Sequence, residues 1–433
     1  MSNYLFDKAL NIQWDLKNSN NESIVFYFSS DLSEKAKQLF YERTNNVKFK
    51  RVYTNLSVKM NDVVYVANDD FHELMKKYCN FYYPLPMNKK YIALTGTNGK
   101  STTVDFIRQL LLIKKKNVLT IGTMGVYLND SKVEDFGLTS PHYIDLRKTL
   151  FEYQEDFEFF AIESSSHALD QKRQYGIIYD YIGWTSFSQD HLDYHQSMEE
   201  YFKCKLKLRE QSKTDFIVSA KSGDFKERFE HETVNYNFNL TQPFLNISYN
   251  QINLDIALGI LEKCGLEFND LEVNSLKPTP GRFNVIENEE QKVVVDFAHT
   301  SDSLENVLKA INESFNQHVV CVFGCGGNRD KTKRPLMGMA AQENSDFIIV
   351  TSDNPRFEDP EEIIKDIVKD LNKEKLMTIV DRKDAIEYAI ENYPESIILV
   401  AGKGHENYID QNGTKSNFSD EETIKNKIKA IKK

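Results

Sequence analysis

The stretch that decides the fold is Tyr91-Ile92-Ala93-Leu94-Thr95-Gly96-Thr97-Asn98-Gly99-Lys100-Ser101-Thr102 (residues 91–102). A short apolar run ends in a turn with two glycines, and a helical pattern begins at Lys100. Backbone N–H groups in such a turn can curl around phosphate oxygens, and the helix N-terminus adds positive potential. Lys100 can reach the β- and γ-phosphates, and the Ser101 hydroxyl can coordinate Mg²⁺. The stretch predicts a nucleotide-binding loop; a glycine turn that only precedes a helix is the alternative.

The alternation of apolar run and helical pattern continues along the chain. Further short runs are Phe157–Ile162, Val293–Val295, Val319–Phe323, Phe347–Val350, Met377–Val380 and Ile397–Val400. Continuous apolar strands separated by helices are typical of parallel sheets covered on both faces. We therefore predict an α/β protein with a small N-terminal α/β domain, a central P-loop-type ATPase domain and a C-terminal Rossmann-like domain.

Two proline-bearing connectors, residues 83–90 and 275–282, divide the chain. A residue before a proline is pushed out of the helical region, so paired prolines give extended and rather stiff connectors. The predicted domains are residues 1–86, 87–277 and 278–433.

Composition excludes several classes of protein. The 433 residues carry 54 Lys and Arg against 65 Asp and Glu, a net charge of −11. This balance disfavours binding to nucleic acid or to an anionic membrane surface. No apolar run of about 18 residues exists to span a bilayer, and the N-terminus has no secretory pattern. The five cysteines form neither an even set nor a zinc spacing, so we expect reduced thiols and a cytoplasmic protein.

Polar motifs follow four of the predicted C-terminal strands: residues 296–299, 324–330, 353–356 and 402–406. Ligands of open parallel sheets bind beyond the carboxyl ends of the strands. The sequence therefore predicts a second binding site at this edge of the C-terminal sheet.

The loop at residues 95–102 resembles the nucleotide loop of the Mur ligases and of the related folylpolyglutamate synthases. Later segments also resemble the Mur ligases, in order and spacing: 163–167, 189–195, 280–282, 296–300, 326–331, 353–356 and 402–406. The set, over about residues 90 to 410, is similar to the family members that add diaminopimelate. The resemblance implies that ATP phosphorylates the D-Glu carboxylate of UDP-MurNAc-L-Ala-D-Glu. The amine of meso-diaminopimelate then attacks the acyl phosphate, in peptidoglycan precursor synthesis.

The resemblance also implies roles for single residues. The catalytic residues would be Lys100, Glu163, His191 and Lys205, and two Mg²⁺ ions would lie on Ser101, Glu163, His191 and a carbamylated Lys205. ATP would contact Gly96, Thr97, Asn98, Gly99, Lys100, Ser101, Thr102, Arg282, Asp296, His299 and Asn306. The UDP-linked acceptor would contact Thr139, Ser140, Ser165 and Arg173. Diaminopimelate would contact Arg329, Asp353, Asn354, Arg356, Gly402 and Glu406.

Lys205 also stands out on physical grounds. Read as a helix, residues 199–208 place Lys203 with Glu199 on a solvated face and Lys205 on the apolar side. A buried ammonium tends to lose its proton, and a neutral amine can take up CO₂ to give a carbamate that binds Mg²⁺. A lysine that snorkels from the helix edge is the alternative.

Arg356 predicts the choice of amino acid. Its planar guanidinium suits a carboxylate, and diaminopimelate carries a carboxylate at its far end where lysine has only an ammonium. Glu406 can take the far ammonium, and Asn354 and Arg329 can complete the carboxylate contacts. A proline-anchored turn without a ligand is the alternative.

Some positions depart from the family pattern. Thr54-Asn55-Leu56 stands where an Asp-Ser-Arg uridine motif is usual, so the uridine contacts of the shortened N-terminal domain do not carry over. Asn250 and Asn253 fit a family spacing but can equally be helix caps. The rival functions are a folylpolyglutamate synthase-like ligase and a nucleotide-binding scaffold without catalysis. We expect a monomer without nucleic-acid or membrane partners.

Overall fold

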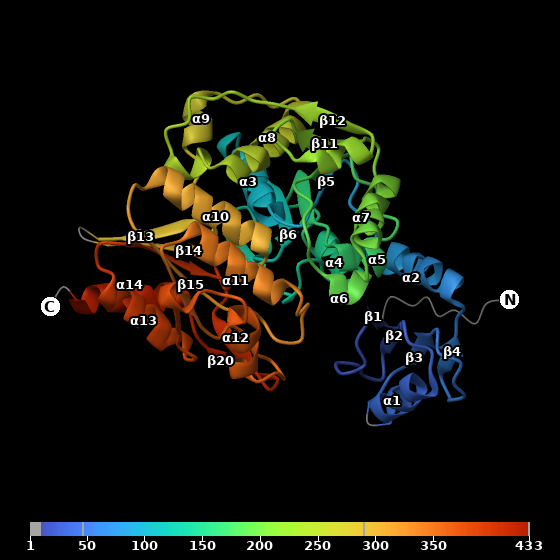
Figure 1. Cartoon of the computed structure of the whole chain (residues 1–433). Coiled ribbons are helices and arrows are strands. Elements are labelled where there is room, and N and C mark those ends of the chain that lie inside the picture. The colour runs from blue at the N-terminus through green and yellow to red at the C-terminus, as the bar shows by residue number, and fades with distance from the viewer. Residues whose placement is uncertain (1–9, 46, 289–290, 432–433) are drawn as a thin grey trace. The chain divides into compact units, whose positions relative to one another are not determined.

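The computed structural model describes residues 10–45, 47–288 and 291–431 (Figure 1). Residues 1–9 lie outside the described ranges. They include the start of the predicted first domain and of the stretch in which the sequence shows no secretory pattern. No helix within the described ranges has the length and hydropathy needed to cross a membrane.

The N-terminal segment forms a four-stranded parallel sheet in the order β1-β2-β3-β4. Its elements are β1 (Asn11–Gln13), β2 (Ser23–Tyr27), α1 (Glu34–Thr44), β3 (Arg51–Thr54), β4 (Val63–Tyr65) and α2 (Asn68–Tyr82). Asn55, directly after β3, is buried, and its side chain bonds the backbone of Ser29 and the side chain of Asn68. The Thr54–Leu56 segment, which differs from the family pattern, therefore connects the carboxyl ends of neighbouring strands through the hydrogen bonds of Asn55.

The central sheet has eight strands in the order β12-β11-β10-β5-β9-β6-β7-β8. Its strands are β5 (Lys90–Thr95), β6 (Val118–Gly122), β7 (Gly125–Leu128), β8 (Ser131–Glu134), β9 (Phe159–Glu163), β10 (Tyr181–Trp184), β11 (Phe216–Ser219) and β12 (His231–Val234). The helices between them are α3 (Lys100–Ile113), α4 (Tyr143–Glu152), α5 (Ser166–Asp170), α6 (Leu192–His195), α7 (Met198–Leu206), α8 (Ser248–Lys263) and α9 (Asp270–Asn274). Short 3₁₀ helices cover Lys207–Gln211, Asp224–Arg228 and Pro243–Leu245. The predicted strand, glycine loop and helix from Lys100 are confirmed.

The C-terminal sheet has the order β13-β14-β18-β15-β16-β17. Its elements are β13 (Asn284–Glu287), β14 (Lys292–Asp296), α10 (Ser301–Ser314), β15 (Val319–Phe323), α11 (Lys333–Asn344), β16 (Phe347–Val350), α12 (Pro360–Val368), β17 (Leu376–Thr378), α13 (Arg382–Asn392) and β18 (Ile397–Ala401). A 3₁₀ helix covers Lys373–Lys375, and the chain continues through the hairpin β19 (Tyr408–Gln411) and β20 (Thr414–Asn417) to α14 (Asp420–Ile431).

The five strands predicted in this part of the chain are all present and pair in parallel. Side chains of β14, β15, β16 and β18 pack on one face against α13 and α14, while α10, α11 and α12 pack on the opposite side (Figure 1). The sequence did not predict the antiparallel edge strand β13, the antiparallel strands β7 and β8, or the β19–β20 hairpin. The α/β class with parallel-rich sheets is thus confirmed.

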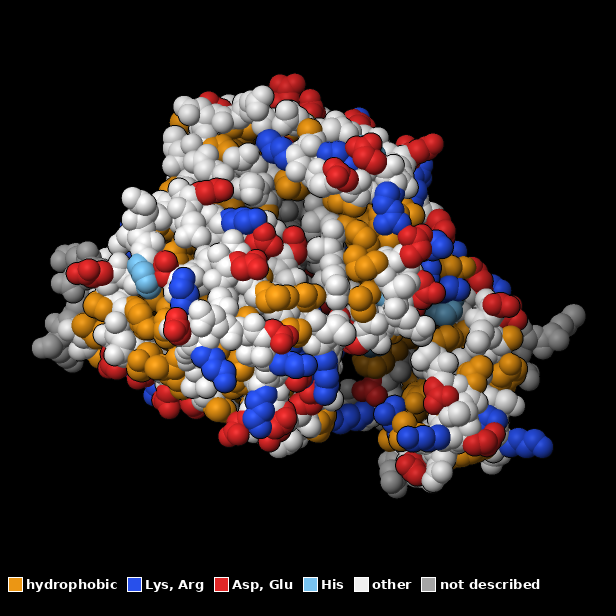
Figure 2. All heavy atoms as spheres, viewed as in Figure 1, with side chains coloured by type: hydrophobic (Ala, Val, Ile, Leu, Met, Phe, Trp, Pro, Cys, Tyr) orange, Lys and Arg blue, Asp and Glu red, His pale blue; other side chains and the backbone are white. Residues whose placement is uncertain are grey.

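By its internal packing the chain forms two compact units. One gathers the chain up to Ala93 with Lys115–Tyr181 and Leu206–Thr214; the other gathers Leu94–Lys114, Ile182–Lys205 and Asp215–Lys433. The domain boundaries at residues 86 and 277 stay a prediction. On the face seen in Figure 2, basic and acidic side chains are interspersed and form no continuous basic field.

Candidate active site

The glycine loop and Lys205 meet within one compact unit. Lys100 donates from Nζ to the carbonyls of Gly96 (2.8 Å) and Thr97 (2.9 Å). Lys205, on α7, donates from Nζ to the same Gly96 carbonyl at 2.7 Å. Two lysine side chains therefore converge on the loop that is predicted to bind phosphates.

Lys205 is 1% exposed, whereas Lys203 on the same helix is exposed and pairs with Glu199 at 3.6 Å. The predicted division of this helix into an apolar and a solvated side is confirmed. Burial, together with the charge of nearby Lys100, lowers the pKa of Lys205 well below its usual range. Lys205 therefore has the low proton affinity that uptake of CO₂ requires.

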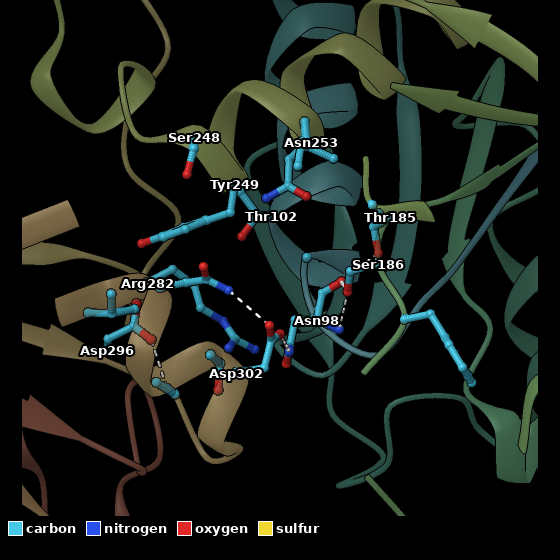
Figure 3. Close-up of a pocket in the computed structure, with 18 of the residues that line it drawn as sticks. Asn98, Thr102, Thr185, Ser186, Ser248, Tyr249, Asn253, Arg282, Asp296 and Asp302 are labelled. Atoms are coloured by element: carbon cyan, nitrogen blue, oxygen red, sulfur yellow. Dashed lines mark hydrogen bonds between the residues drawn. The ribbon is translucent and has the colours of Figure 1, made fainter. Parts of the chain in front are cut away.

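A cavity of about 260 Å³ opens beside the loop (Figure 3). Asn98 and Gly99 from the loop line it, together with Arg282, Asp296 and Asn306, which the sequence analysis placed at the nucleotide. Other lining residues are Thr102, Thr185, Ser186, Ser248, Tyr249, Asn253, Asp302 and Ser303. The cavity thus joins the phosphate loop to the predicted adenosine side chains.

Charged groups at this cavity are held firmly. Arg282 approaches the Ser101 hydroxyl at 3.4 Å and stacks on the Phe297 ring, whose centroid lies 4.3 Å from the guanidinium carbon. Asp296 is buried and accepts hydrogen bonds from the backbone N–H groups of Phe283 and Ala298, both at 2.7 Å. Burial raises the pKa of Asp296, and the Arg282 charge opposes that rise.

Asn253 lines the cavity from α8 and does not cap the helix. Helix α8 begins at Ser248 without a side-chain cap, and Asn253 lies one turn further in, buried, with its Oδ1 accepting from Thr103 at 3.2 Å. A Cβ atom on Gly99 would lie 2.3 Å from that oxygen, so the loop approaches Asn253 as only glycine allows. The cap interpretation of Asn250 and Asn253 is therefore wrong.

His299 does not belong to the lining of this cavity, although the resemblance places it near adenosine. Its Nε2 lies 3.6 Å from Oδ2 of buried Asp190, which also neighbours His191 (3.3 Å) and Lys333 (3.5 Å). Burial alone would raise the pKa of Asp190, but the bond from His299 and the charge of Lys333 hold it well below its usual range. Asp190 and Lys333 were not among the predicted site residues; Asp190 lies inside the motif at residues 189–195, and Lys333 lies two residues beyond the motif that ends at Lys331.

The predicted acceptor contacts lie together in the other compact unit. Ser140 Oγ donates to the carbonyl of Glu163 (2.7 Å) and lies 3.3 Å from Ser165 Oγ. Arg173 Nη1 donates to the Ser140 carbonyl at 2.9 Å. Thr139 Oγ1 lies 3.0 Å from the hydroxyl of Thr123. Four residues separated by up to 34 positions in sequence therefore form one polar cluster at the end of β9.

Glu163 belongs to the same cluster. Its carboxylate accepts from the backbone N–H (2.8 Å) and the hydroxyl (3.2 Å) of Thr123, which leaves lone pairs on both oxygens. Within the described ranges, no three His, Cys, Asp or Glu side chains are grouped to hold a metal ion. Three of the four predicted donors, a hydroxyl, a carboxylate and a carbamate, offer the oxygen atoms that Mg²⁺ prefers, and the fourth, the His191 imidazole, would offer a nitrogen.

The residues predicted to bind the amino acid lie in the segments that follow the carboxyl ends of β15, β16 and β18. Arg356 Nη1 donates to the Gly327 carbonyl at 2.8 Å. Its backbone N–H bonds the Asp410 carbonyl in the β19–β20 hairpin at 2.9 Å. Partial burial and the Arg356 guanidinium lower the pKa of Arg329. Two guanidinium groups thus lie near each other, an arrangement that suits a carboxylate.

The acidic residues of this cluster surround Lys403, which is not among the predicted site residues. Asn354 is 3% exposed; its Nδ2 donates to Glu406 Oε2 (2.8 Å), and its Oδ1 accepts from Lys403 (3.1 Å). Asp410 N also donates to that oxygen at 2.9 Å. Asn354 therefore organises the pocket, since most of its hydrogen-bonding capacity is used by protein groups. The signal for Lys403 was its place inside a strand-end motif.

Comparison with known proteins agrees with this geometry. Residues 94–288 match the Mur ligase middle domain, and residues 281–404 match the Mur ligase glutamate ligase domain. A UDP-N-acetylmuramoyl-L-alanyl-D-glutamate–2,6-diaminopimelate ligase of Aquifex aeolicus is 36% identical over 82% of this chain and 81% of its own. A ligase of the same name from Clostridium acetobutylicum is 34% identical over 88% and 86%.

Solved structures give the same picture. A structure of a UDP-N-acetylmuramoyl-L-alanyl-D-glutamate–2,6-diaminopimelate ligase is 28% identical, with a TM-score of 0.62 over 98% of this chain and 95% of its own. The folylpolyglutamate synthase of Mycobacterium tuberculosis, solved with ADP and AMPPCP, is 12% identical with a TM-score of 0.60 over 76% and 90%, which shows a shared fold. With both domain models matched and relatives of this identity along most of its length, the chain belongs to the Mur ligase family of ATP-dependent ligases.

Proposed function

We propose that this chain joins meso-diaminopimelate to the D-Glu carboxylate of UDP-MurNAc-L-Ala-D-Glu, with cleavage of ATP to ADP and phosphate, in cytoplasmic peptidoglycan precursor synthesis. The observation that carries the proposal is the cluster of Arg356, Arg329 and Glu406 at one sheet edge. It offers paired guanidiniums and a carboxylate, which suit an amino-acid head group. The names of the relatives support the same substrates.

The phosphate loop supplies the first half of the reaction. The γ-phosphoryl group of ATP passes to a carboxylate oxygen of D-Glu, and ADP leaves. Lys100 and Arg282 place positive charge beside the phosphates, where negative charge develops. The remaining loop residues, Gly96 to Thr102, bind through backbone N–H groups and hydroxyls. Asn98, Asp296 and Asn306 hold the nucleoside in the cavity of Figure 3.

Ser101, Glu163, His191 and a carbamate on Lys205 would hold two Mg²⁺ ions. Bound Mg²⁺ would neutralise charge on the phosphate oxygens. Lys205 fits the carbamate because its environment depresses the pKa of the amine. The carbamate would place an anionic group near the Lys100 ammonium, and the two would attract each other.

The C-terminal residues at the strand ends bind the amino acid whose amine reacts. Arg356 and Arg329 bind the far carboxylate of diaminopimelate, and Glu406 binds its far ammonium. Asp353 and Gly402, which lie close to each other, complete the contacts to the amino acid. The near amine attacks the acyl phosphate carbon, phosphate leaves, and the amine loses its proton. Lysine would set an ammonium against the half-buried Arg356 and leave that guanidinium without a carboxylate partner, which disfavours lysine.

The acceptor is held by Thr139, Ser140, Ser165 and Arg173, whose polar cluster surrounds Glu163. The residues are spaced to offer hydroxyls and a guanidinium to a sugar-peptide with carboxylates. We expect the enzyme to act as a monomer.

The test compares kcat/KM for meso-diaminopimelate and L-lysine in the wild type and in Arg356→Ala. We expect the wild type to prefer diaminopimelate by roughly 10⁴-fold and the variant to lose most of that preference. Arg209→Ala, at an exposed arginine outside the pocket, is the matched control. Efficient lysine addition by the wild type would refute the assignment. ATP binding without phosphate release, even with the acceptor and the amino acid both present, would favour the scaffold alternative.

A further inference from the structure

Lys403 lies in the loop after β18 and is fully buried. Its Nζ is 3.1 Å from Glu406 Oε2, 3.1 Å from Asn354 Oδ1 and 3.7 Å from Asp353 Oδ1. All three partners are among the residues that we assign to the amino acid. A buried cation survives only where acceptors compensate for its lost hydration, and here two carboxylates and an amide do so.

The hydrogen bonds of Glu406 are directed to one oxygen. Oε2 accepts from both Lys403 and Asn354, at 3.1 and 2.8 Å. Two donors on one carboxylate oxygen restrict the rotation of the side chain. Because Oε2 is held by protein donors, Oε1 is the oxygen that can accept from a ligand. The Glu406 side chain is 21% exposed, whereas Lys403 is not exposed at all.

We infer that Lys403 is a positioning residue that presents Glu406 Oε1 to the far ammonium of the amino-acid substrate. This inference rests on the proposed function. Lys403 itself does not contact the substrate. It also offsets one of the two carboxylates, so that the acidic side of the pocket carries one net negative charge. An acidic side with one net charge matches one ammonium and does not favour a second cation.

The inference predicts coupling between Lys403 and one group of the substrate. The probe is 2-aminopimelate, which keeps the far carboxylate of diaminopimelate and lacks the far amine. In the wild type, loss of that amine should lower kcat/KM by about 10²-fold or more, because Glu406 loses its partner in a pocket built for it. In Lys403→Met the same comparison should give a loss of less than about 10-fold, because Glu406 keeps only the bond from Asn354 and can rotate about it.

Two further variants separate positioning from folding. Lys403→Gln keeps a side-chain donor within reach of Asn354 and Glu406 without the charge, and should show an intermediate ratio. Lys415→Met is the matched control, since Lys415 is exposed and lies 3.9 Å from the Tyr408 ring centroid in the same hairpin region. It should keep the wild-type ratio. KM for ATP should change less than about twofold in every variant.

A uniform fall in rate with both amino acids, at an unchanged ratio, would overturn the role of Lys403. Failure of both Lys403 variants to fold would equally overturn it, because the residue would then be structural. Wild-type protein that releases no phosphate with diaminopimelate would overturn the proposed function itself. The wild-type rate and the variant ratio therefore report on the two proposals separately.

Discussion

Gly402 offers a sharp test of the amino-acid pocket. Its φ angle is +113°, a conformation that L-residues with a side chain rarely adopt. A Cβ atom placed on Gly402 would lie 2.6 Å from Asp353 Oδ2. Gly402→Ala therefore combines backbone strain with a collision against a carboxylate that faces Lys403.

The size of the effect follows from these two terms. An unfavourable backbone conformation of this kind costs about 1–3 kcal/mol. The contact must also open from 2.6 Å to ordinary van der Waals separation, which begins at 3.4 Å, a shift of 3.4 − 2.6 = 0.8 Å. Misplacement of a binding group by about 1 Å can lower the rate about 10²-fold. We expect kcat/KM for diaminopimelate to fall by roughly that factor, with a lowered Tm.

The matched control is Gly413→Ala in the β19–β20 turn. Gly413 has a φ of +76°, but its nearest contact for an added Cβ is the exposed Phe357 ring at 3.4 Å. This variant carries the strain without the collision. Both variants are assayed for amine-dependent phosphate release and for thermal unfolding. If Gly402→Ala keeps kcat/KM within twofold of Gly413→Ala, the close approach to Asp353 does not shape the pocket.

Three other predictions concern separate parts of the chain. With ¹³C-bicarbonate, NMR should show a carbamate resonance that disappears in Lys205→Ala. The same variant should lose activity and recover part of it when short carboxylic acids are added. Full activity of the wild type without CO₂ would contradict this prediction. Arg382→Met should destabilise the fold by about 3–5 kcal/mol, because the buried Asp420 carboxylate loses its bidentate partner at 2.7 and 2.8 Å. Arg382→Met/Asp420→Leu should regain most of the Tm, and a Tm like that of the single variant would argue against the pair. Burial raises the pKa of Asp145 to about 6, although the hydrogen bond from Trp14 acts in the opposite direction. The carboxylate is therefore less stable in the folded than in the unfolded chain, so it lowers the stability fully above pH 6 and not below pH 4. Asp145→Asn should thus raise the stability by about 1 kcal/mol at pH 7.5, a value limited by solvent screening, and change it little at pH 4; an equal gain at both values would refute the cause.

The sequence alone predicted the main parallel strands with helices between them, and it predicted a phosphate loop and a set of strand-end motifs as candidate sites. The apolar run, the glycine turn and the helix from Lys100 to Ile113 lie within about 25 consecutive residues, so their pattern is local. The same holds for the C-terminal strands and the motifs that follow them. Lys205 was predicted to be buried because helical spacing separates it from Lys203, and the structure confirms it.

Only the tertiary structure decided which polar groups meet. Asp190 lies beside His299 and Lys333, more than 100 residues away in sequence, and no local pattern encodes those partners. The three acceptors around Lys403 likewise come from two separate strand ends. The β19–β20 hairpin and the antiparallel strands were missed because short polar strands depend on pairing for their conformation. The pairing of strands and the burial of side chains are set by the packing of segments that are distant in sequence. The spacing of the motifs therefore placed Lys403 after a strand, but it could not identify Glu406, Asn354 and Asp353 as its partners.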